Sequence, residues 1–160
     1  MTKGQIRAIN DAMDGYRCKR NTGAFTWSST SEPQFHYKDY TSALDSIAQE
    51  GGMGFAQEMM IHDGKAIKTP RPLGNRNVFR TLCLNSDNQL ALYGSQGIVT
   101  LGNFIDELLS QGVKDALYTD MGQGWNYCFY RVNQSDKSPK YLHSTSLPHA
   151  SNFIIIKCRK

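Results

Sequence analysis

The sequence predicts an α+β fold: a mixed β-sheet with hairpins, one β-α-β unit and about three helices packed on it. Amphipathic segments with helical spacing lie between short apolar segments with the pattern of strands, so the chain contains both kinds of element. Hairpin patterns interrupt the alternation of strands and helices. This interruption excludes a fully doubly wound sheet.

Two helices are expected in the first third of the chain. Residues 3–13 place their apolar side chains at helical spacing and form the first. Residues 40–50 form the second, which Asp39 or Thr41 can cap. Two glycines at 51–52 end this helix, because glycine readily adopts the left-handed conformation of a helix C-terminus.

The third helix begins after Thr100, which is expected to act as its N-cap. Gly112 ends it with an apolar residue behind, the signature of a Schellman motif. Strands at 89–93 and 115–119 flank the helix, so residues 89–119 form the β-α-β unit, with a right-handed crossover. The buried stripe of the helix consists of Leu101, Phe104, Ile105, Leu108 and Leu109.

The remaining strands are predicted from apolar runs and turn residues. Residues 53–62 suit one strand, which ends in a turn that begins at His62, and His62 itself is expected to lie at the surface. Residues 78–84 and 89–93 form a hairpin. Further strands are expected at 35–37, 125–131 and 152–158, and loops at 65–77 and 133–150.

Length and composition fit one soluble globular domain that spans residues 1–160. The chain has 39% hydrophobic and 20% charged residues, which is ordinary for a folded domain. Its net charge of +4 is mild and its basic residues are scattered, so no nucleic-acid partner is expected. The longest apolar run, at 153–156, is too short to span a bilayer, and no signal peptide opens the chain.

The four cysteines and four histidines have a spacing that predicts no zinc site. Cys83, Cys128 and Cys158 lie in apolar, strand-like runs, which indicates buried thiols, and a disulfide among them stays open. No ligand string specifies another metal. We therefore expect no cofactor, while calcium near clustered carboxylates and carbonyls stays open.

Three stretches follow one another in an order that resembles a known family. They are "DGK" at 63–65, "FRTLCLNSDNQLALYG" at 79–94 and "GIVTLGNFIDELLSQGVKDALYTDMGQGW" at 97–125. Their order is similar to that of the phosphodiester glycosidase domain, the domain of the mannose-6-phosphate uncovering enzyme and its bacterial relatives. In that family an arginine strand is followed by a hairpin, a helix and a strand that ends in an aspartate–glycine motif.

The resemblance covers residues 53–131 and implies a hydrolase that cleaves a sugar-1-phosphodiester, such as a GlcNAc-α-1-phosphodiester. It also implies a small-molecule or glycan phosphodiester substrate and a secreted or periplasmic, bacterial protein. The N-terminal portion is short for the family, which implies an N-terminally truncated member. Such chemistry needs a guanidinium for the phosphate and a carboxylate for the oxocarbenium-like anomeric carbon.

Asp120 and Glu58 are the candidate catalytic carboxylates. Asp120 follows a strand and precedes a glycine-rich turn, where it takes part in catalysis or accepts turn N–H bonds as an Asx-type cap. Glu58 interrupts an apolar run, so it faces solvent on the polar side of a strand or is a functional carboxylate in a cleft. If the two carboxylates converge, their separation indicates a retaining or an inverting mechanism.

Arg80 is the candidate phosphate ligand, because a charge that interrupts an apolar strand needs a partner. The alternative is an edge-strand arginine that points to solvent, and Arg76 is the second candidate. Backbone N–H groups in a glycine turn suit anionic oxygens. The candidate substrate-binding residues beyond the arginines are Gly122, Gly124, Trp125, Asn126 and Gln57.

The aspartate motif departs from the family pattern, because Met121 follows Asp120 where the family has glycine. Two functions therefore stay open. The chain is a hydrolase of sugar phosphodiesters, or it is a catalytically inactive glycan- or phosphate-binding module on the same fold.

Overall fold

The computed structural model describes residues 21–119, 128–133, 135, 137–138 and 140–143. They belong to two compact units, of which the larger ends at residue 120 and the smaller begins at residue 121. The expectation that the whole chain forms one domain stays a prediction. The helix expected at 3–13 and the strand expected at 152–158 lie outside the described residues.

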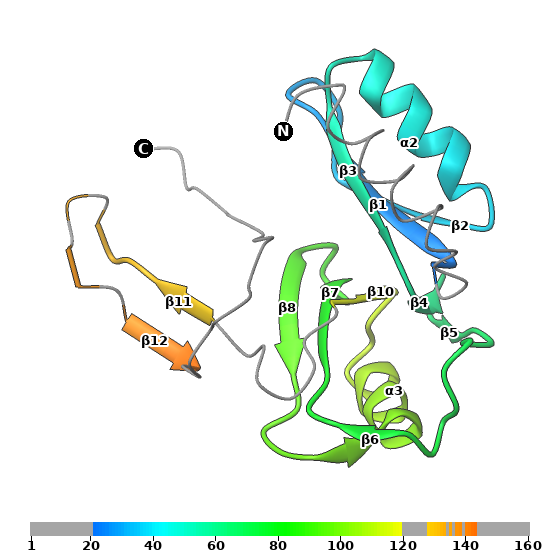
Figure 1. Ribbon diagram of the computed structural model, residues 1–160, viewed down its shortest axis with the longest axis vertical. Helices are drawn as coiled ribbons and strands as arrows, with labels where there is room; N and C mark the ends of the chain where they lie inside the picture. Colours follow the sequence, from blue (N-terminus) through cyan, green and yellow to red (C-terminus); the bar gives the residue numbers. More distant parts are fainter. Residues whose placement is uncertain (1–20, 120–127, 134, 136, 139, 144–160) are drawn as a thin grey trace. The chain divides into compact units, whose positions relative to one another are not determined.

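The first sheet of the larger unit has three antiparallel strands in the order β2-β1-β3. Helix α2 connects β2 to β3 and packs on this sheet (Figure 1). Strand β1 was not predicted, because it is buried along most of its length and therefore lacks the alternation of a half-exposed strand. The elements are β1 (Gly23–Trp27), β2 (Gln34–Tyr37), α2 (Tyr40–Gln49) and β3 (Met53–Gln57).

The second sheet has five strands in the order β5-β4-β10-β7-β8, and every neighbouring pair is antiparallel. The pair β7–β8 confirms the predicted hairpin. The strands are β4 (Met59–His62), β5 (Lys65–Ala66), β7 (Arg80–Leu84), β8 (Leu90–Gly94) and β10 (Asp115–Tyr118). A short additional pair joins β6 (Arg76–Asn77) to β9 (Val99–Thr100).

Helix α3 (Leu101–Ser110) confirms the predicted link between β8 and β10. Both strands are antiparallel to β7, so they run in the same direction on its two sides. The expected β-α-β unit is therefore present with β7 inserted between its strands. The α+β fold class is confirmed, and the described residues contain two of the expected helices.

Both described helices end as their sequences predict. Gly51 and Gly112 have φ angles of 79° and 73°, and each glycine and its successor donate hydrogen bonds to carbonyls of the preceding helical turn. These bonds define Schellman motifs. At the other end of α3, the Thr100 side chain accepts a hydrogen bond from the backbone N–H of Asn103 at 3.1 Å. Asp39 occupies the N-cap position of α2 without a side-chain cap bond.

The two sheets face each other, with one helix on each outer face. Helix α3 packs on the outer face of the five-stranded sheet through an apolar cluster around Phe79 and Tyr118. A second cluster joins the inner faces through Phe25, Leu82 and Leu117. A third, with Leu44, lies between α2 and the three-stranded sheet. The larger unit thus has the layer order α2, first sheet, second sheet, α3.

Three boundary expectations are wrong. Residues 53–62 do not form one strand, because β3 and β4 belong to different sheets and Glu58 lies between them. Residues 65–77 are not loop throughout, since β5 and β6 lie within them. Strands of two residues are too short to give a periodic pattern. Residues 133–150 were expected to be loop but contain β12 (Lys140–His143).

The smaller unit contains one antiparallel pair of strands, β11 (Cys128–Tyr130) and β12 (Lys140–His143). Strand β11 confirms the strand expected at 125–131 over its three residues. Arg131 lies beyond the end of β11, and residues 125–127 lie outside the described part of the chain.

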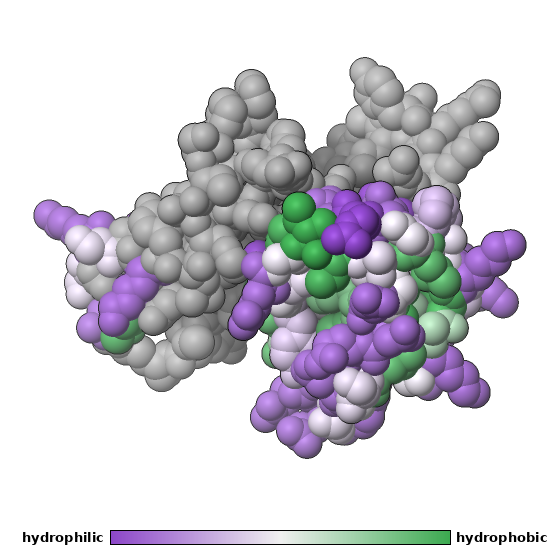
Figure 2. All heavy atoms as spheres, turned by 90° about the horizontal axis from the view of Figure 1, so that it is seen from below, coloured by the Kyte–Doolittle hydropathy of each residue, from purple (hydrophilic) through white to green (hydrophobic). Residues whose placement is uncertain are grey.

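Apolar and hydrophilic side chains are interspersed on the face of the larger unit that Figure 2 shows. Figure 2 shows green apolar groups broken up by purple hydrophilic ones on the face seen from below. Among the described residues of this unit, the large exposed apolar ones are Leu73, Leu90, Leu92 and Ile98. Among the described residues, no helix is long and apolar enough to cross a membrane.

Cys83 should resist thiol reagents in the folded protein. Its side chain is fully buried, and burial raises its pKa to about 11. Because the thiolate is the reactive form, we expect alkylation near pH 8 to be about 100-fold slower than for an ordinary thiol. Mass spectrometry of iodoacetamide-treated protein, with and without urea, measures this rate. Equal labelling of Cys83 in both conditions would contradict its burial.

Candidate functional site

One end of the five-stranded sheet brings together residues that are far apart in the sequence. Glu58 precedes β4, Arg80 opens β7, and Thr119 follows β10. The backbone N–H of Tyr118 donates to the Glu58 carbonyl at 2.8 Å, and that of Thr119 donates to the Arg80 carbonyl at 3.1 Å. Glu58 and Arg80 therefore flank the end of the strand that leads into Asp120.

Glu58 is buried, with only 1% of its surface exposed, so the solvent-facing alternative is wrong. Its carboxylate accepts two hydrogen bonds from one residue. The Nε–H of Arg71 donates to Oε2 at 3.2 Å, and the backbone N–H of Arg71 donates to Oε1 at 3.3 Å. A buried carboxylate needs such a partner, because an unpaired charge in the interior is strongly destabilising.

Arg71 is held from a second side by an aromatic ring. The centre of its guanidinium lies 4.6 Å from the centroid of the Tyr118 ring, which is a cation–π distance. Its side chain is 14% exposed. The bonds from Arg71 to Glu58 use only Nε and the backbone nitrogen. Within the described part of the chain, the two terminal nitrogens of Arg71 make no hydrogen bond or ion pair. The Arg71 guanidinium is thus held by the hydrogen bond from its Nε to Glu58 and by stacking on the Tyr118 ring.

Arg80 has different surroundings. Strand β7 lies between β10 and β8, so the edge-strand alternative is wrong. Its Nη1 donates to the carbonyls of Phe79 and Ser95, each at 2.9 Å. A Cβ atom on Gly94, its partner across the strands, would lie within 2.7 Å of the Arg80 side chain. Arg80 therefore lies flat against β8 and ties it to β7.

The side chains of Arg80 and Tyr118 belong to opposite faces of the sheet. Successive side chains of a strand alternate between faces. Phe79 and Tyr118 belong to the cluster under α3, whereas Leu82 belongs to the cluster between the sheets. Arg80 therefore shares the inner face with Leu82, while Arg71 stacks on a ring of the outer face. The backbones of Glu58 and Arg80 thus both pair with the end of β10, but the guanidinium groups of Arg71 and Arg80 lie on opposite faces of the sheet.

The other predicted site residues fall into two groups. Gln57 is half-buried at the end of β3, directly before Glu58, and its carbonyl accepts from the backbone N–H of Thr22 at 3.1 Å. Arg76 is exposed in β6 and pairs with Thr100 of β9. Asp120, Gly122, Gly124, Trp125 and Asn126 lie outside the described residues.

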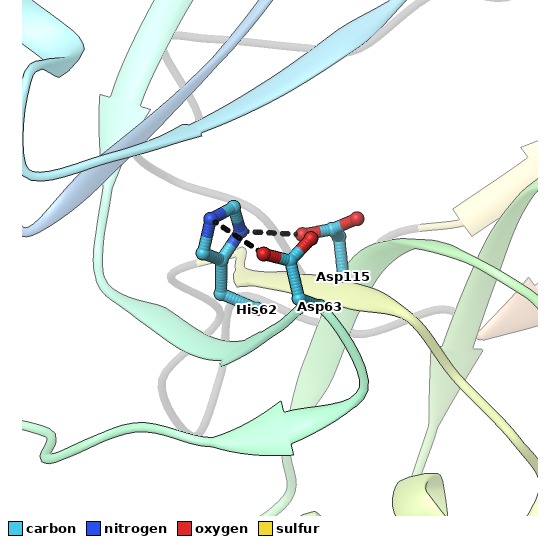
Figure 3. A group of neighbouring side chains, drawn as sticks. All are labelled: His62, Asp63 and Asp115. Carbon is cyan, nitrogen blue, oxygen red and sulfur yellow. Dashed lines mark hydrogen bonds and ion pairs between the residues drawn. The ribbon is translucent and has the colours of Figure 1, made fainter.

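A second polar cluster lies at the opposite end of β4 and β10 (Figure 3). His62 ends β4, and its Nδ1 lies 2.7 Å from Oδ1 of Asp115 at the start of β10. Its Nε2 lies 3.6 Å from Oδ2 of Asp63 in the turn after β4. His62 is half-buried by this contact and by the Tyr37 ring, whose centroid lies 5.6 Å from that of the imidazole.

His36 lies close enough to this cluster to interact with it electrostatically. Burial lowers the pKa of His36 below its ordinary value of 6.5, and the charge of a protonated His62 lowers it further. Its Nε2 lies 2.8 Å from the hydroxyl oxygen of Thr26 on the neighbouring strand. This hydrogen bond links the His36 side chain of β2 to Thr26 of β1.

Neither Arg71 nor the pair His62–Asp115 was predicted from the sequence. Arg71 lies in a segment rich in proline and basic residues, which is typical of a solvated loop. The sequence did contain one signal for Arg71: Glu58 lies in an apolar run, and a buried carboxylate there requires a cationic partner from elsewhere in the chain. His62 and Asp115 are separated by 53 residues, so no local pattern connects them.

The described unit is a two-sheet α+β structure with a buried glutamate–arginine pair at one sheet end and a histidine–aspartate pair at the other. No protein-family model matches the chain, and neither the curated proteins nor the solved structures searched give a match.

His36 should make folding stability depend on pH. Because its pKa is lowered in the folded state, the unfolded state binds more protons just below pH 6.5. The free energy of unfolding should therefore fall as pH decreases from about 7 through this window. Urea unfolding of the wild type and of His36→Gln measures the effect, which the variant should lack. An NMR titration that gives His36 a pKa at or above 6.5 would refute the explanation.

Proposed function

We propose that this protein is a hydrolase of sugar-1-phosphodiesters and that it acts at the end of the five-stranded sheet. The observation that carries the proposal is the buried Glu58–Arg71 pair beside the strand that leads into Asp120. The order of motifs that resembles the phosphodiester glycosidase domain gives the class of substrate.

Glu58 and Asp120 have the chemistry for the anomeric carbon. Cleavage of a glycosidic bond passes through an oxocarbenium-like state, which one carboxylate stabilises or attacks. The phosphate monoester that departs is already a good leaving group, so little general-acid assistance is needed. Glu58 has the fixed position that such a role requires, because Arg71 holds both of its oxygens.

Arg71 is the residue that we assign to the substrate phosphate, with Arg80 as the second candidate. A guanidinium stacked on an aromatic ring and anchored through Nε keeps its terminal N–H groups in a fixed plane, which suits two phosphate oxygens. Nη1 of Arg80 is already bonded to two backbone carbonyls. That pattern favours a structural contribution from Arg80.

A catalytically inactive glycan- or phosphate-binding module is the second candidate. Two observations favour it. The hydrogen bonds from Arg71 engage both oxygens of Glu58, as in a purely structural ion pair. Met121 also replaces the glycine of the resembled family. This candidate predicts phosphate binding without turnover.

Hydrolysis of a GlcNAc-α-1-phosphodiester distinguishes the two candidates. We expect the wild type to release the sugar, and Asp120→Asn and Glu58→Gln each to lower kcat by about 100-fold or more, because each removes a reacting carboxylate. Glu32→Gln, at an exposed position, is the matched control and should keep full activity. Circular dichroism confirms that each variant is folded. A wild type that binds the diester without cleaving it would establish the binding module instead.

Binding of inorganic phosphate tests the assignment of Arg71. We expect Arg71→Lys to weaken binding about tenfold or more, because a lysine cannot offer two N–H groups in one plane. Arg131→Lys, at an exposed position without a proposed role, should bind as the wild type does. Isothermal titration calorimetry measures the dissociation constants. A loss in Arg80→Lys with unchanged binding in Arg71→Lys would transfer the role to Arg80.

A further inference from the structure

The cluster of His62, Asp63 and Asp115 lies at the sheet end opposite to Glu58 and takes no part in the proposed hydrolysis. Figure 3 shows both carboxylates beside the imidazole, with a dashed line from each ring nitrogen to one of them. One donor atom from each of the three residues lies within 4.8 Å of the others. Such proximity of an imidazole and two carboxylates is the first requirement of a metal site.

The contact with Asp115 determines which nitrogen of His62 is available. A carboxylate only accepts hydrogen bonds, so Nδ1 must donate its proton to Oδ1 of Asp115 across 2.7 Å. In the neutral ring, the lone pair then lies on Nε2. A carboxylate that orients a histidine in this way is the usual outer partner of a metal-binding imidazole. Asp115 is only 12% exposed, so its position is well defined.

The second distance in the cluster suits an ion better than a hydrogen bond. Nε2 of His62 lies 3.6 Å from Oδ2 of Asp63, which exceeds the range of a good hydrogen bond. Two donors that each lie about 2.1 Å from a shared ion are separated by about 3.0 to 3.4 Å for bond angles of 90° to 109°. A shift of a few tenths of an ångström, within the reach of the exposed Asp63 side chain, therefore brings both atoms into coordination distance.

The charges of the cluster are unbalanced without a cation. Asp63 and Asp115 both approach His62, and in the described residues neither forms an ion pair with a lysine or arginine. The nearby Lys114 donates its Nζ to Oδ1 of Asn88 instead. With a neutral imidazole the three side chains carry a charge of about −2, which a divalent cation compensates.

The backbone holds the turn in place before any ion binds. Asp63 and Gly64 have φ angles of 51° and 70°, as in the two-residue turn of a tight hairpin. The backbone N–H of Gly64 donates to the Lys114 carbonyl at 2.8 Å, which ties the turn to the residue before β10. Little conformational entropy would therefore be lost on binding.

We propose that His62 Nε2 and the Asp63 carboxylate bind a divalent transition-metal ion of the zinc type, with Asp115 as the positioning residue. Water completes the coordination, because only two side chains supply direct ligands. An imidazole ligand favours Zn²⁺, Co²⁺ or Ni²⁺ over Mg²⁺ and Ca²⁺, which prefer oxygen ligands alone. The site is independent of the proposed hydrolase function, since it shares no residue with the Glu58 end of the sheet.

Titration with Zn²⁺ tests the site in the full chain. By isothermal titration calorimetry we expect the wild type to bind one equivalent that His62→Gln and Asp63→Asn both lack. Asp63→Asn should fold normally, because asparagine before glycine is well suited to this turn. Asp115→Asn should weaken the same binding event by about 10- to 100-fold. On addition of Zn²⁺, the ¹⁵N signal of His62 Nε2 should shift, which separates this site from the other histidines.

Asp87→Asn is the matched control, because Asp87 also lies in an exposed hairpin turn of this sheet but contacts no imidazole of the described residues. It should keep the full stoichiometry. Three results would overturn the proposal: no bound Zn²⁺ in the wild type, the same stoichiometry in Asp63→Asn and His62→Gln as in the wild type, or equally tight binding of Mg²⁺. None of these results bears on hydrolysis at the other sheet end, so the two proposals fail separately.

Discussion

The burial of Glu58 is the constraint on which the arrangement of the larger unit depends. Glu58 lies where the chain leaves the first sheet at β3 and enters the second at β4. A carboxylate in this position cannot remain unpaired, because desolvating a charge costs far more than one hydrogen bond returns. Arg71 therefore has to fold back onto Glu58. This ion pair connects the junction of the two sheets to the loop between β5 and β6.

Strand β10 connects the Glu58–Arg71 pair at one end of the second sheet to the His62–Asp115 pair at the other. Its last residue, Tyr118, bonds the Glu58 backbone and presents its ring to Arg71. Its first residue, Asp115, bonds His62 at the opposite end. Between these ends the strand is buried on both faces, by α3 on one side and by the first sheet on the other. Polar chemistry is therefore confined to the two ends of β10, where charged side chains reach partners or solvent.

The sequence predicts well what depends on neighbouring residues. Thr100, Gly51 and Gly112 act at the helix ends as predicted, because caps and Schellman motifs are local. Apolar periodicity likewise locates α3 and the β7–β8 hairpin. It fails at β1, whose two faces are both covered, and at β5 and β6, which are too short to show a period. Partners distant in sequence, such as Arg71 for Glu58, leave no local pattern at all.

The two arginines near the end of β10 show why charge in an apolar run does not by itself identify a ligand-binding residue. Arg80 satisfies the sequence criterion, since it opens a buried strand, yet its Nη1 bonds two backbone carbonyls and its side chain lies on Gly94. Arg71 fails that criterion, because it lies in a loop. It nevertheless has the rigid support, from Nε and the ring of Tyr118, that preorganised anion binding requires. The partners of a guanidinium, rather than its position in the sequence, therefore decide which role it can take.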